Sequence, residues 1–181
     1  MISNGSLIFP LCLPFLAQAI NMTFYNPQCD VDYVFGPFYE QLLKATEDPT
    51  STSSMIDFFT PNGTLRALNN TARGPDQIIQ LRQSLLPVDG SVQWNHYPNI
   101  TFVSAETAVD KNYQVSGILH SITGGNCSTT YFSTRFTVTK NETTGIPSLG
   151  PHSGSLIDIT VSSLVTLMTH ALRNIESANA G

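Results

Sequence analysis

The chain has 181 residues, of which 41% are hydrophobic and 12% are charged, and its formal net charge is −5 at pH 7. This length and hydrophobic content suit one globular domain with its own core. The acidic balance and the absence of a basic run argue against nucleic acid as a partner. Soluble domains typically have roughly 25% charged residues, so we expect something other than charge to keep this surface soluble.

The first element in chain order is an expected secretory signal peptide over residues 1–19. An apolar run, LIFPLCLPFL, is followed by AQA. The run is too short to span a bilayer, which needs about 20 apolar residues. A short apolar core followed by A-x-A is typical of a cleaved signal, whereas the alternative is a buried N-terminal segment. We therefore expect residues 20–181 to form a single mature domain, located outside the cell or in the secretory-pathway lumen.

Six asparagines beyond this segment begin N-x-S/T sequons without proline at x. They are Asn21, Asn62, Asn69, Asn99, Asn126 and Asn141. Six sequons in about 160 residues exceed a chance density and support secretion. N-glycans at several of them would explain how a chain with few charges stays soluble.

Of the three cysteines, cleavage of the signal would remove Cys12 and leave Cys29 and Cys127. A secreted domain with two cysteines most simply pairs them. A catalytic thiol would need a positioned base and a reducing or protected setting. We therefore expect a Cys29–Cys127 disulfide, which would stabilise the fold by roughly 4 kcal/mol in the chain-entropy model.

Apolar residues at helical spacing predict a first helix over residues 29–47, CDVDYVFGPFYEQLLKATE. Gly36-Pro37 inside this segment is expected to kink or divide the helix. The segment SMIDFF, residues 54–59, predicts one or two further helical turns. The following TPNG has turn chemistry, and residues 64–68 are expected to form a short strand.

A second helix is expected to begin at Gly74-Pro75-Asp76, because proline is favourable at an early helical position. Pro87 and Gly90 end it. After this helix, hydrophobic residues recur at every second position instead of at helical spacing, which indicates strands. Residues 93–103 predict one strand with an irregularity at Pro98.

Two long strands are expected over residues 107–122 and 129–139, joined by a turn at Gly124-Gly125. Residues 156–161 predict a last strand, and residues 162–174 a closing amphipathic helix. Helices followed by long antiparallel strands define an α+β class. A curved sheet with helices on one face would enclose a cone that suits a small molecule.

This order, with the segments "MIDFFTPNGTLRA", "ARGPDQIIQLRQSL" and "WNHYPNITFVSAETAV", resembles the NTF2-like superfamily, in particular its SnoaL-like and ketosteroid-isomerase-like branch. The positions that carry the resemblance are Phe58-Phe59, Asn62-Gly63, Gly74 with Ile78, and His96 near Asn99. It covers about residues 31–161. The resemblance implies a cone-shaped fold of helices and a curved antiparallel sheet, with the C-terminal helix as an addition.

The same resemblance implies roles for particular residues. In the steroid isomerases of this branch, a tyrosine on the first helix donates to the developing enolate and a carboxylate at the end of the first strand moves the proton. Tyr39 fits the tyrosine position. The position of that carboxylate falls at about Ala67, so the base is absent. A second acid that binds the enolate would fall near Tyr131 or Phe132, where only the tyrosine could serve. Steroid-type isomerisation is therefore not expected.

Three further residues are candidates for catalysis. His96 is a candidate general base or oxyanion donor if its strand face lines the cone, and otherwise a histidine satisfied by backbone or on the outer face. Arg135 would bind a carboxylate or anhydride oxygen, unless it is exposed on the outer face. Asp158 is either directed outward or a substitute base inside the pocket. The side chains expected to line the pocket are Trp94, Tyr113, Tyr131 and Phe58.

The sequence contains no metal-binding spacing, no phosphate loop and no nucleophile elbow, so we expect neither a metal nor a cofactor. The leading hypothesis is a cofactor-free cyclase or isomerase acting on a hydrophobic, polyketide-derived secondary metabolite. Secreted, ketosteroid-isomerase-like proteins of fungal biosynthetic clusters, including those that dimerise maleic anhydride units, are similar in kind. The alternative is a non-catalytic secreted binder or effector-like protein. The expected partner is a small hydrophobic molecule, with no membrane span, and a homodimer is left open.

Overall fold

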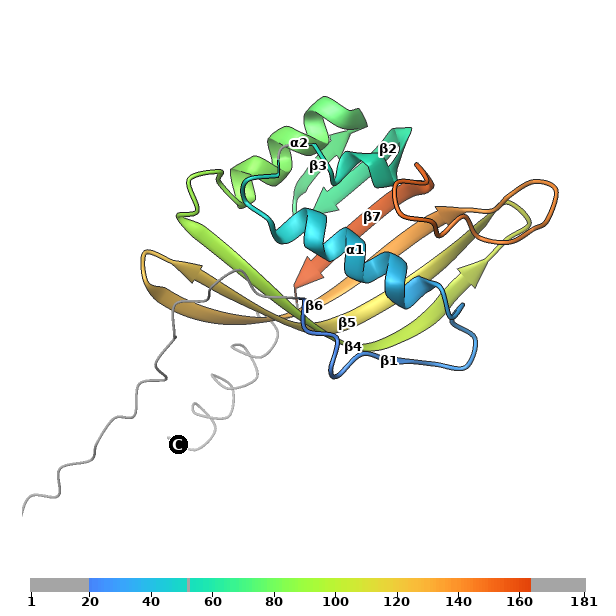
Figure 1. Cartoon of the computed structure of the whole chain (residues 1–181), viewed down its shortest axis with the longest axis horizontal. Helices are drawn as coiled ribbons and strands as arrows, with labels where there is room; N and C mark the ends of the chain where they lie inside the picture. Colours follow the sequence, from blue (N-terminus) through green and yellow to red (C-terminus); the bar gives the residue numbers. More distant parts are fainter. Residues whose placement is uncertain (1–19, 52, 164–181) are drawn as a thin grey trace, which may run out of the picture.

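The computed structural model describes residues 20–51 and 53–163. The expected signal peptide lies outside the described residues, and so does the expected closing helix from residue 164 onward. Within the described part of the chain, seven strands form one curved sheet with the order β1-β4-β5-β6-β7-β2-β3. Helix α1 crosses the concave face of this sheet and α2 lies beside β2 and β3 (Figure 1). The α+β class and the curved, helix-covered sheet are thus confirmed.

The bounds of the elements follow the predicted order closely. The helices are α1 (Phe35–Glu47), the single 3₁₀ turn η1 (Ile56–Phe58) and α2 (Gly74–Leu85). The strands are β1 (Asn26–Pro27), β2 (Phe59–Ala67), β3 (Asn70–Arg73), β4 (Val92–Glu106), β5 (Asp110–Thr123), β6 (Asn126–Thr139) and β7 (Leu156–Ser163). The sheet is mixed rather than wholly antiparallel, because β1 pairs with β4 and β2 pairs with β7 in parallel.

The long hairpins β4-β5 and β5-β6 make the curved wall of the cone. Gly124 and Gly125 turn β5 into β6 with φ angles of 55° and 80°, which glycine adopts without strain. The register of β4 against β5 shifts between Pro98 and Thr101, which confirms the irregularity expected at Pro98. Gly117 lies opposite Pro98, where a Cβ atom would clash with the backbone of β4. The sheet can therefore bend at this point only because residue 117 has no side chain.

Two details of the predicted elements are wrong, and two strands were not predicted. The first helix begins at Phe35 rather than Cys29, so Gly36-Pro37 lies in its first turn, where proline removes no helical hydrogen bond and causes no kink. The segment expected to form a turn at residues 60–63 belongs to β2 and appears as a register shift against β7. Strands β1 and β3 were not expected, since both are short and mostly exposed.

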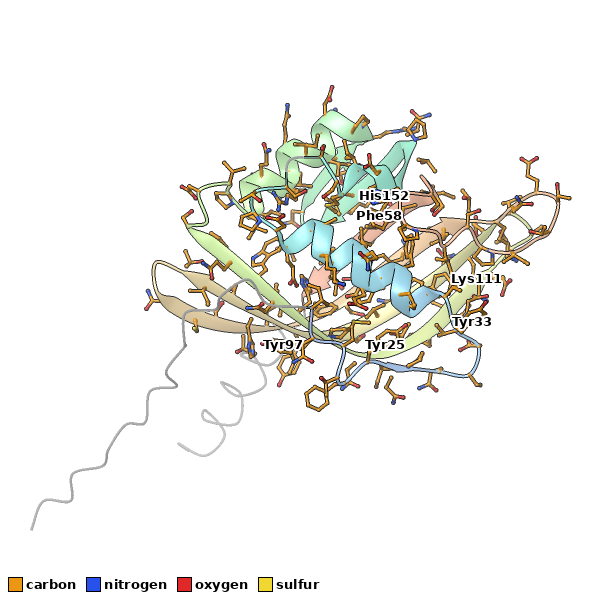
Figure 2. All side chains as sticks on the ribbon, in the orientation of Figure 1. Tyr25, Tyr33, Phe58, Tyr97, Lys111 and His152 are labelled. Atoms are coloured by element: carbon orange, nitrogen blue, oxygen red, sulfur yellow. The ribbon has the colours of Figure 1, made fainter. Side chains whose placement is uncertain are left out.

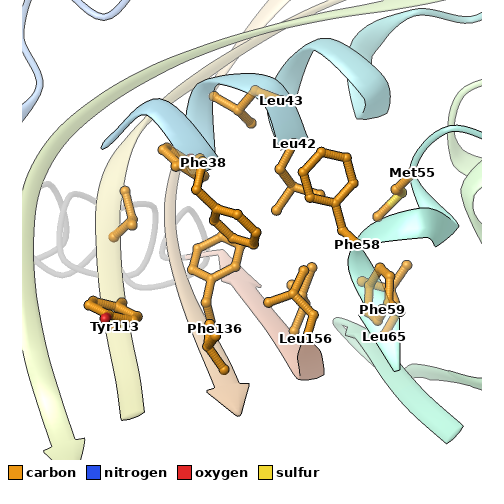
Figure 3. Packing of buried hydrophobic residues seen from close by; sticks show 14 of the residues in the cluster. Phe38, Leu42, Leu43, Met55, Phe58, Phe59, Leu65, Tyr113, Phe136 and Leu156 are labelled. Atoms are coloured by element: carbon orange, nitrogen blue, oxygen red, sulfur yellow. The ribbon is translucent and has the colours of Figure 1, made fainter. Parts of the chain in front are cut away.

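The core lies between α1 and the sheet. Phe38 and Leu42 of α1 point toward Phe136 and Leu156 on the strands, and Phe58 of η1 closes one side (Figure 3). The rings of Phe38 and Phe58 meet edge to face with centroids 5.5 Å apart. Helix α1 is therefore fixed to the sheet mainly by aromatic packing, which also fixes where its C-terminal end lies.

The predicted Cys29–Cys127 disulfide is wrong. Cys29 is a free, exposed cysteine, so it is not bonded to Cys127. Cys29 lies near Thr101 of β4, because the backbone N–H of Gln28 donates to the Thr101 carbonyl. Cys127 lies near Gln93 of β4, because Cys127 is opposite Ile122 on β5 and Ile122 is opposite Gln93. These positions on β4 are separated by roughly 25 Å at about 3.3 Å per residue. A disulfide requires Cα atoms within about 7 Å, so the two cysteines cannot be bonded.

A partly buried ion pair joins the segment before α1 to the end of the sheet away from α2, where Lys111 lies (Figure 2). Lys111 Nζ lies 2.7 Å from Asp32 Oδ2, and Tyr113 donates its hydroxyl to the same oxygen at 2.6 Å. Burial by itself raises the pKa of Asp32, but the hydrogen bonds from Lys111 and Tyr113 outweigh it and lower the pKa overall. Folding therefore favours the ionised form of Asp32.

We predict that this pair makes stability depend on acid pH. A carboxyl group whose pKa is lowered by folding contributes fully above its unfolded pKa of about 3.9, and the contribution is lost as pH falls through the folded pKa. Urea unfolding of the wild type and Asp32→Asn should therefore differ at pH 7 and converge as the pH falls below about 4. Asp30→Asn, an exposed neighbour, is the control. A difference that stays constant across this range would contradict the prediction.

Candidate functional site

The concave face of the sheet, α1 and α2 enclose a cavity of about 330 Å³. This volume lies in the range of small-molecule sites, roughly 300–1,000 Å³. Its walls are mostly carbon. The larger apolar side chains include Leu42, Leu43, Leu65, Leu119, Phe132 and Phe136. The cavity thus offers a hydrophobic molecule a largely apolar surface.

His96 and Glu47 form a hydrogen-bonded pair at the wall of this cavity. Alternation along β4 directs His96 to the same face as Trp94, and both line the cavity. His96 Nδ1 lies 2.5 Å from Glu47 Oε1, and the backbone N–H of His96 donates to the same oxygen at 2.7 Å. Both side chains are largely buried, with 14% and 10% of their surface exposed. Glu47 therefore fixes both the position and the ring orientation of His96.

The Glu47 contact also decides which nitrogen of His96 is free. A carboxylate accepts hydrogen bonds, so the hydrogen-bond network assigns the proton to Nδ1. In the neutral imidazole, Nε2 then has the lone pair. The Phe132 ring packs edge-on against the imidazole, with centroids 5.1 Å apart. This arrangement of a carboxylate, an imidazole and a free Nε2 is the one that general bases use.

Sequence reasoning identified His96 and missed Glu47. Glu47 is the last residue of α1 and lies 49 residues before His96 in the chain. In the sequence it ends the helical segment 29–47 like any solvated glutamate. Only the packing of α1 across the sheet brings its carboxylate to β4.

Arg82 of α2 holds the chain on both sides of Glu47. Arg82 is 4% exposed, and its guanidinium donates to the backbone carbonyls of Thr46, Asp48, Pro49 and Ser51. Nε and Nη2 reach Thr46 O at 3.3 and 3.1 Å, and Nη1 reaches Ser51 O at 3.0 Å. Burial lowers the pKa of Arg82, and nearby Asp48 opposes this effect. With five donors for five hydrogen bonds, Arg82 has none left for a bound molecule.

Tyr39 of α1 also lines the cavity, as expected. Its ring packs edge-on against Phe136 with centroids 5.3 Å apart, and only 1% of the residue is exposed. Burial, followed by the charge of Glu47, raises the pKa of Tyr39, so the phenol stays neutral. Its hydroxyl makes no hydrogen bond to the described residues and is available as a donor.

Two expected catalytic residues lie on the opposite face of the sheet. Ile159 and Val161 line the cavity, so Asp158, which precedes Ile159 on β7, points outward. Asp158 pairs with Arg66, accepts the Thr160 hydroxyl at 2.7 Å and lies 3.9 Å from Arg135. The expectations that Asp158 is a pocket base and that Arg135 binds an anion in the pocket are therefore wrong.

The expected aromatic lining is only partly correct. Trp94 lines the cavity, and it is the single tryptophan of the chain. Tyr131 lies on the outer face, because its neighbour Phe132 points inward. Tyr113 and Phe58 belong to the packed core: Tyr113 stacks on Phe35 with centroids 4.0 Å apart, and Phe58 packs on α1.

The structure adds three observations to the remaining predictions. All six sequon asparagines are exposed, and their glycosylation stays a prediction. None of the helices in the described part of the chain combines the length and hydropathy needed to cross a membrane. Residues 20–51 and 53–163 contain no group of three His, Cys, Asp or Glu side chains placed to hold a metal ion.

No family model and no curated protein matches the sequence, but solved structures share the fold. Aln2 from a Streptomyces species aligns with a TM-score of 0.57 at 13% identity, over 77% of this chain and 94% of that chain. ActVI-ORFA from Streptomyces coelicolor aligns with a TM-score of 0.56 at 12% identity, over 72% and 95%. A ketosteroid isomerase-like protein from Erwinia carotovora atroseptica gives 0.54 at 15% identity, over 72% and 94%. At these identities the likeness shows the fold alone, a curved sheet with helices on its concave face.

Proposed function

We propose that the protein is a cofactor-free cyclase or isomerase that acts on a hydrophobic, polyketide-derived small molecule. The observation that carries the proposal is the His96–Glu47 pair, which places an oriented base in the wall of an apolar cavity. Such a site suits removal of a proton from carbon next to a carbonyl group. A structural neighbour described as ketosteroid isomerase-like supports the same reaction class at the level of fold.

The proposed reaction begins with proton transfer from the bound molecule to His96 Nε2. Glu47 stabilises the imidazolium that forms, in the manner of the carboxylate in a catalytic triad. Tyr39 donates its hydroxyl to the enolate oxygen, which the apolar surroundings would otherwise destabilise. In a cyclase, the enolate carbon then attacks a second carbonyl carbon, whose oxygen takes the proton from His96 Nε2 as the new C–C bond forms. In an isomerase, the enolate takes the proton back from His96 at another carbon. Dimerising cyclisation of maleic anhydride units is a narrower form that starts with the same step.

Ala67 favours a second candidate, a non-catalytic binder. It lies in the cavity wall where the resemblance to steroid isomerases places the catalytic carboxylate. A protein that only carries a hydrophobic ligand needs no base there. In that case the His96–Glu47 pair would be a satisfied polar contact in the wall.

Metabolite profiling of a producer strain distinguishes the two candidates. We compare strains carrying the wild-type gene, no gene, His96→Gln and Arg135→Gln. An enzyme predicts that the deletion and His96→Gln lose the same product and accumulate the same precursor, while the outer-face variant Arg135→Gln matches the wild type. Profiles that do not change on deletion would instead support the binder. A normal product with His96→Gln would exclude His96 as the base.

A further inference from the structure

We infer that the cavity selects uncharged carbonyl compounds and excludes carboxylates of the same size. The inference concerns the substrate class of the site described above and rests on the proposed function. It follows from which charges the walls contain, which of them are already bound, and which polar groups remain free.

Among the described residues, the only cationic or potentially cationic side chains in the cavity wall are Arg82 and His96. Every N–H of Arg82 donates to a backbone carbonyl near the end of α1, so the guanidinium cannot also bind an anion. His96 has its Nδ1 on Glu47, whose negative charge would repel a second carboxylate nearby. A carboxylate entering this cavity would lose its water without gaining a counter-charge, which is strongly unfavourable.

The exposed arginines of the neighbouring strands do not change this balance. Arg66 and Arg135 have 46% and 49% of their side-chain surface exposed, and both face Asp158 on the outer side of the sheet. Side chains on alternate residues of β6 and β7 line the cavity, so the sheet itself separates these cations from it. An anion attracted by them would bind outside the cone.

The polar groups that remain free in the wall are neutral. Thr130 and Thr134 make no side-chain hydrogen bonds within the described residues, nor do the indole of Trp94 and the phenol of Tyr39. In contrast, the hydroxyls of Thr46 and Ser162 already donate to backbone carbonyls. Neutral O–H and N–H donors in an apolar wall match the carbonyl oxygen of a ketone, ester or anhydride, which needs a hydrogen bond but no counter-charge.

A matched pair of ligands tests the inference directly. 4-(Biphenyl-4-yl)butan-2-one and 3-(biphenyl-4-yl)propanoate share one shape and differ only in a methyl group or a charged oxygen. Because Trp94 is the single tryptophan and lines the cavity, its fluorescence reports occupancy in the full chain at pH 7. We expect saturable binding of the ketone, with the carboxylate at least about 30-fold weaker. Equal or tighter binding of the carboxylate overturns the inference.

Two variants make the test specific to the cavity. Thr134→Lys places an ammonium group in the wall, and we expect carboxylate binding to appear or tighten while circular dichroism shows an intact fold. Arg135→Gln removes a cation from the outer face and should change neither affinity. A carboxylate affinity in Thr134→Lys that is no higher than in the wild type would overturn the inference.

The outcomes also separate the inference from the proposed function. If the carboxylate binds as well as the ketone and His96→Gln still blocks the product in the producer strain, only the selectivity is wrong. If neither ligand changes the emission of Trp94, the inference fails, while the metabolite profile of the His96→Gln strain still decides the proposed function.

Discussion

Turnover should fall by about 10²–10³-fold when Glu47 is replaced by glutamine, while the affinity for a ligand in the cavity changes little. The Glu47 carboxylate accepts two hydrogen bonds from His96, one from the ring at 2.5 Å and one from the backbone at 2.7 Å. A glutamine amide keeps the shape but loses the negative charge that stabilises the imidazolium. It can also turn its NH₂ group toward Nδ1, which would move the imidazole proton to Nε2 and remove the free base.

The measurement is the rate of product formation by purified protein on the precursor identified by profiling, together with ligand affinity from Trp94 fluorescence. Glu40→Gln is the matched control, since Glu40 lies on the same helix and forms an exposed pair with Lys44 at 2.7 Å. We expect this control to keep wild-type turnover. A Glu47→Gln protein that turns over at the wild-type rate would show that Glu47 only supports packing.

The fold was predictable from the sequence to a large extent, because the spacing of hydrophobic residues and the turn residues determine helices, strands and turns locally. Gly124-Gly125 and Pro98 set the ends and the bend of the long strands wherever the rest of the chain lies. The false turn at residues 60–63 shows the limit of the same reasoning. Pro61 and Asn62 have turn chemistry, but pairing with β7 on one side allows β2 to continue through them with a register shift.

The candidate site was less predictable, because it depends on which face of each strand points inward. Alternation shows that Arg135 and Phe132 face opposite sides, but it does not show which side is the cavity. The packing of α1 decides this, since its aromatic side chains need Phe136 as a partner. Glu47 and Arg82 could not be identified for a related reason. Their roles depend on where α1 ends relative to β4 and α2, which no local pattern encodes.

Replacing Arg82 by methionine should lower the free energy of unfolding by about 3 kcal/mol or more. Methionine fills much of the same volume, but it leaves the carbonyls of Thr46, Asp48, Pro49 and Ser51 without their donors in a partly buried setting. The C-terminal end of α1 also loses a cation that its dipole favours. Lysine should restore only part of the loss, since one ammonium group cannot reach carbonyls spread around a planar guanidinium.

Urea unfolding at about 25 °C measures this effect, with Arg73→Met as the control because Arg73 is an exposed arginine at the start of α2. We expect the control to lie within about 0.5 kcal/mol of the wild type. An Arg82→Met protein as stable as this control would show that the carbonyls find water instead. Replacing Arg82 should also affect the reaction for which Glu47 is needed. Arg82 fixes the backbone on both sides of Glu47, so folded Arg82→Lys protein should also lose turnover, because the carboxylate that orients His96 is no longer held in place.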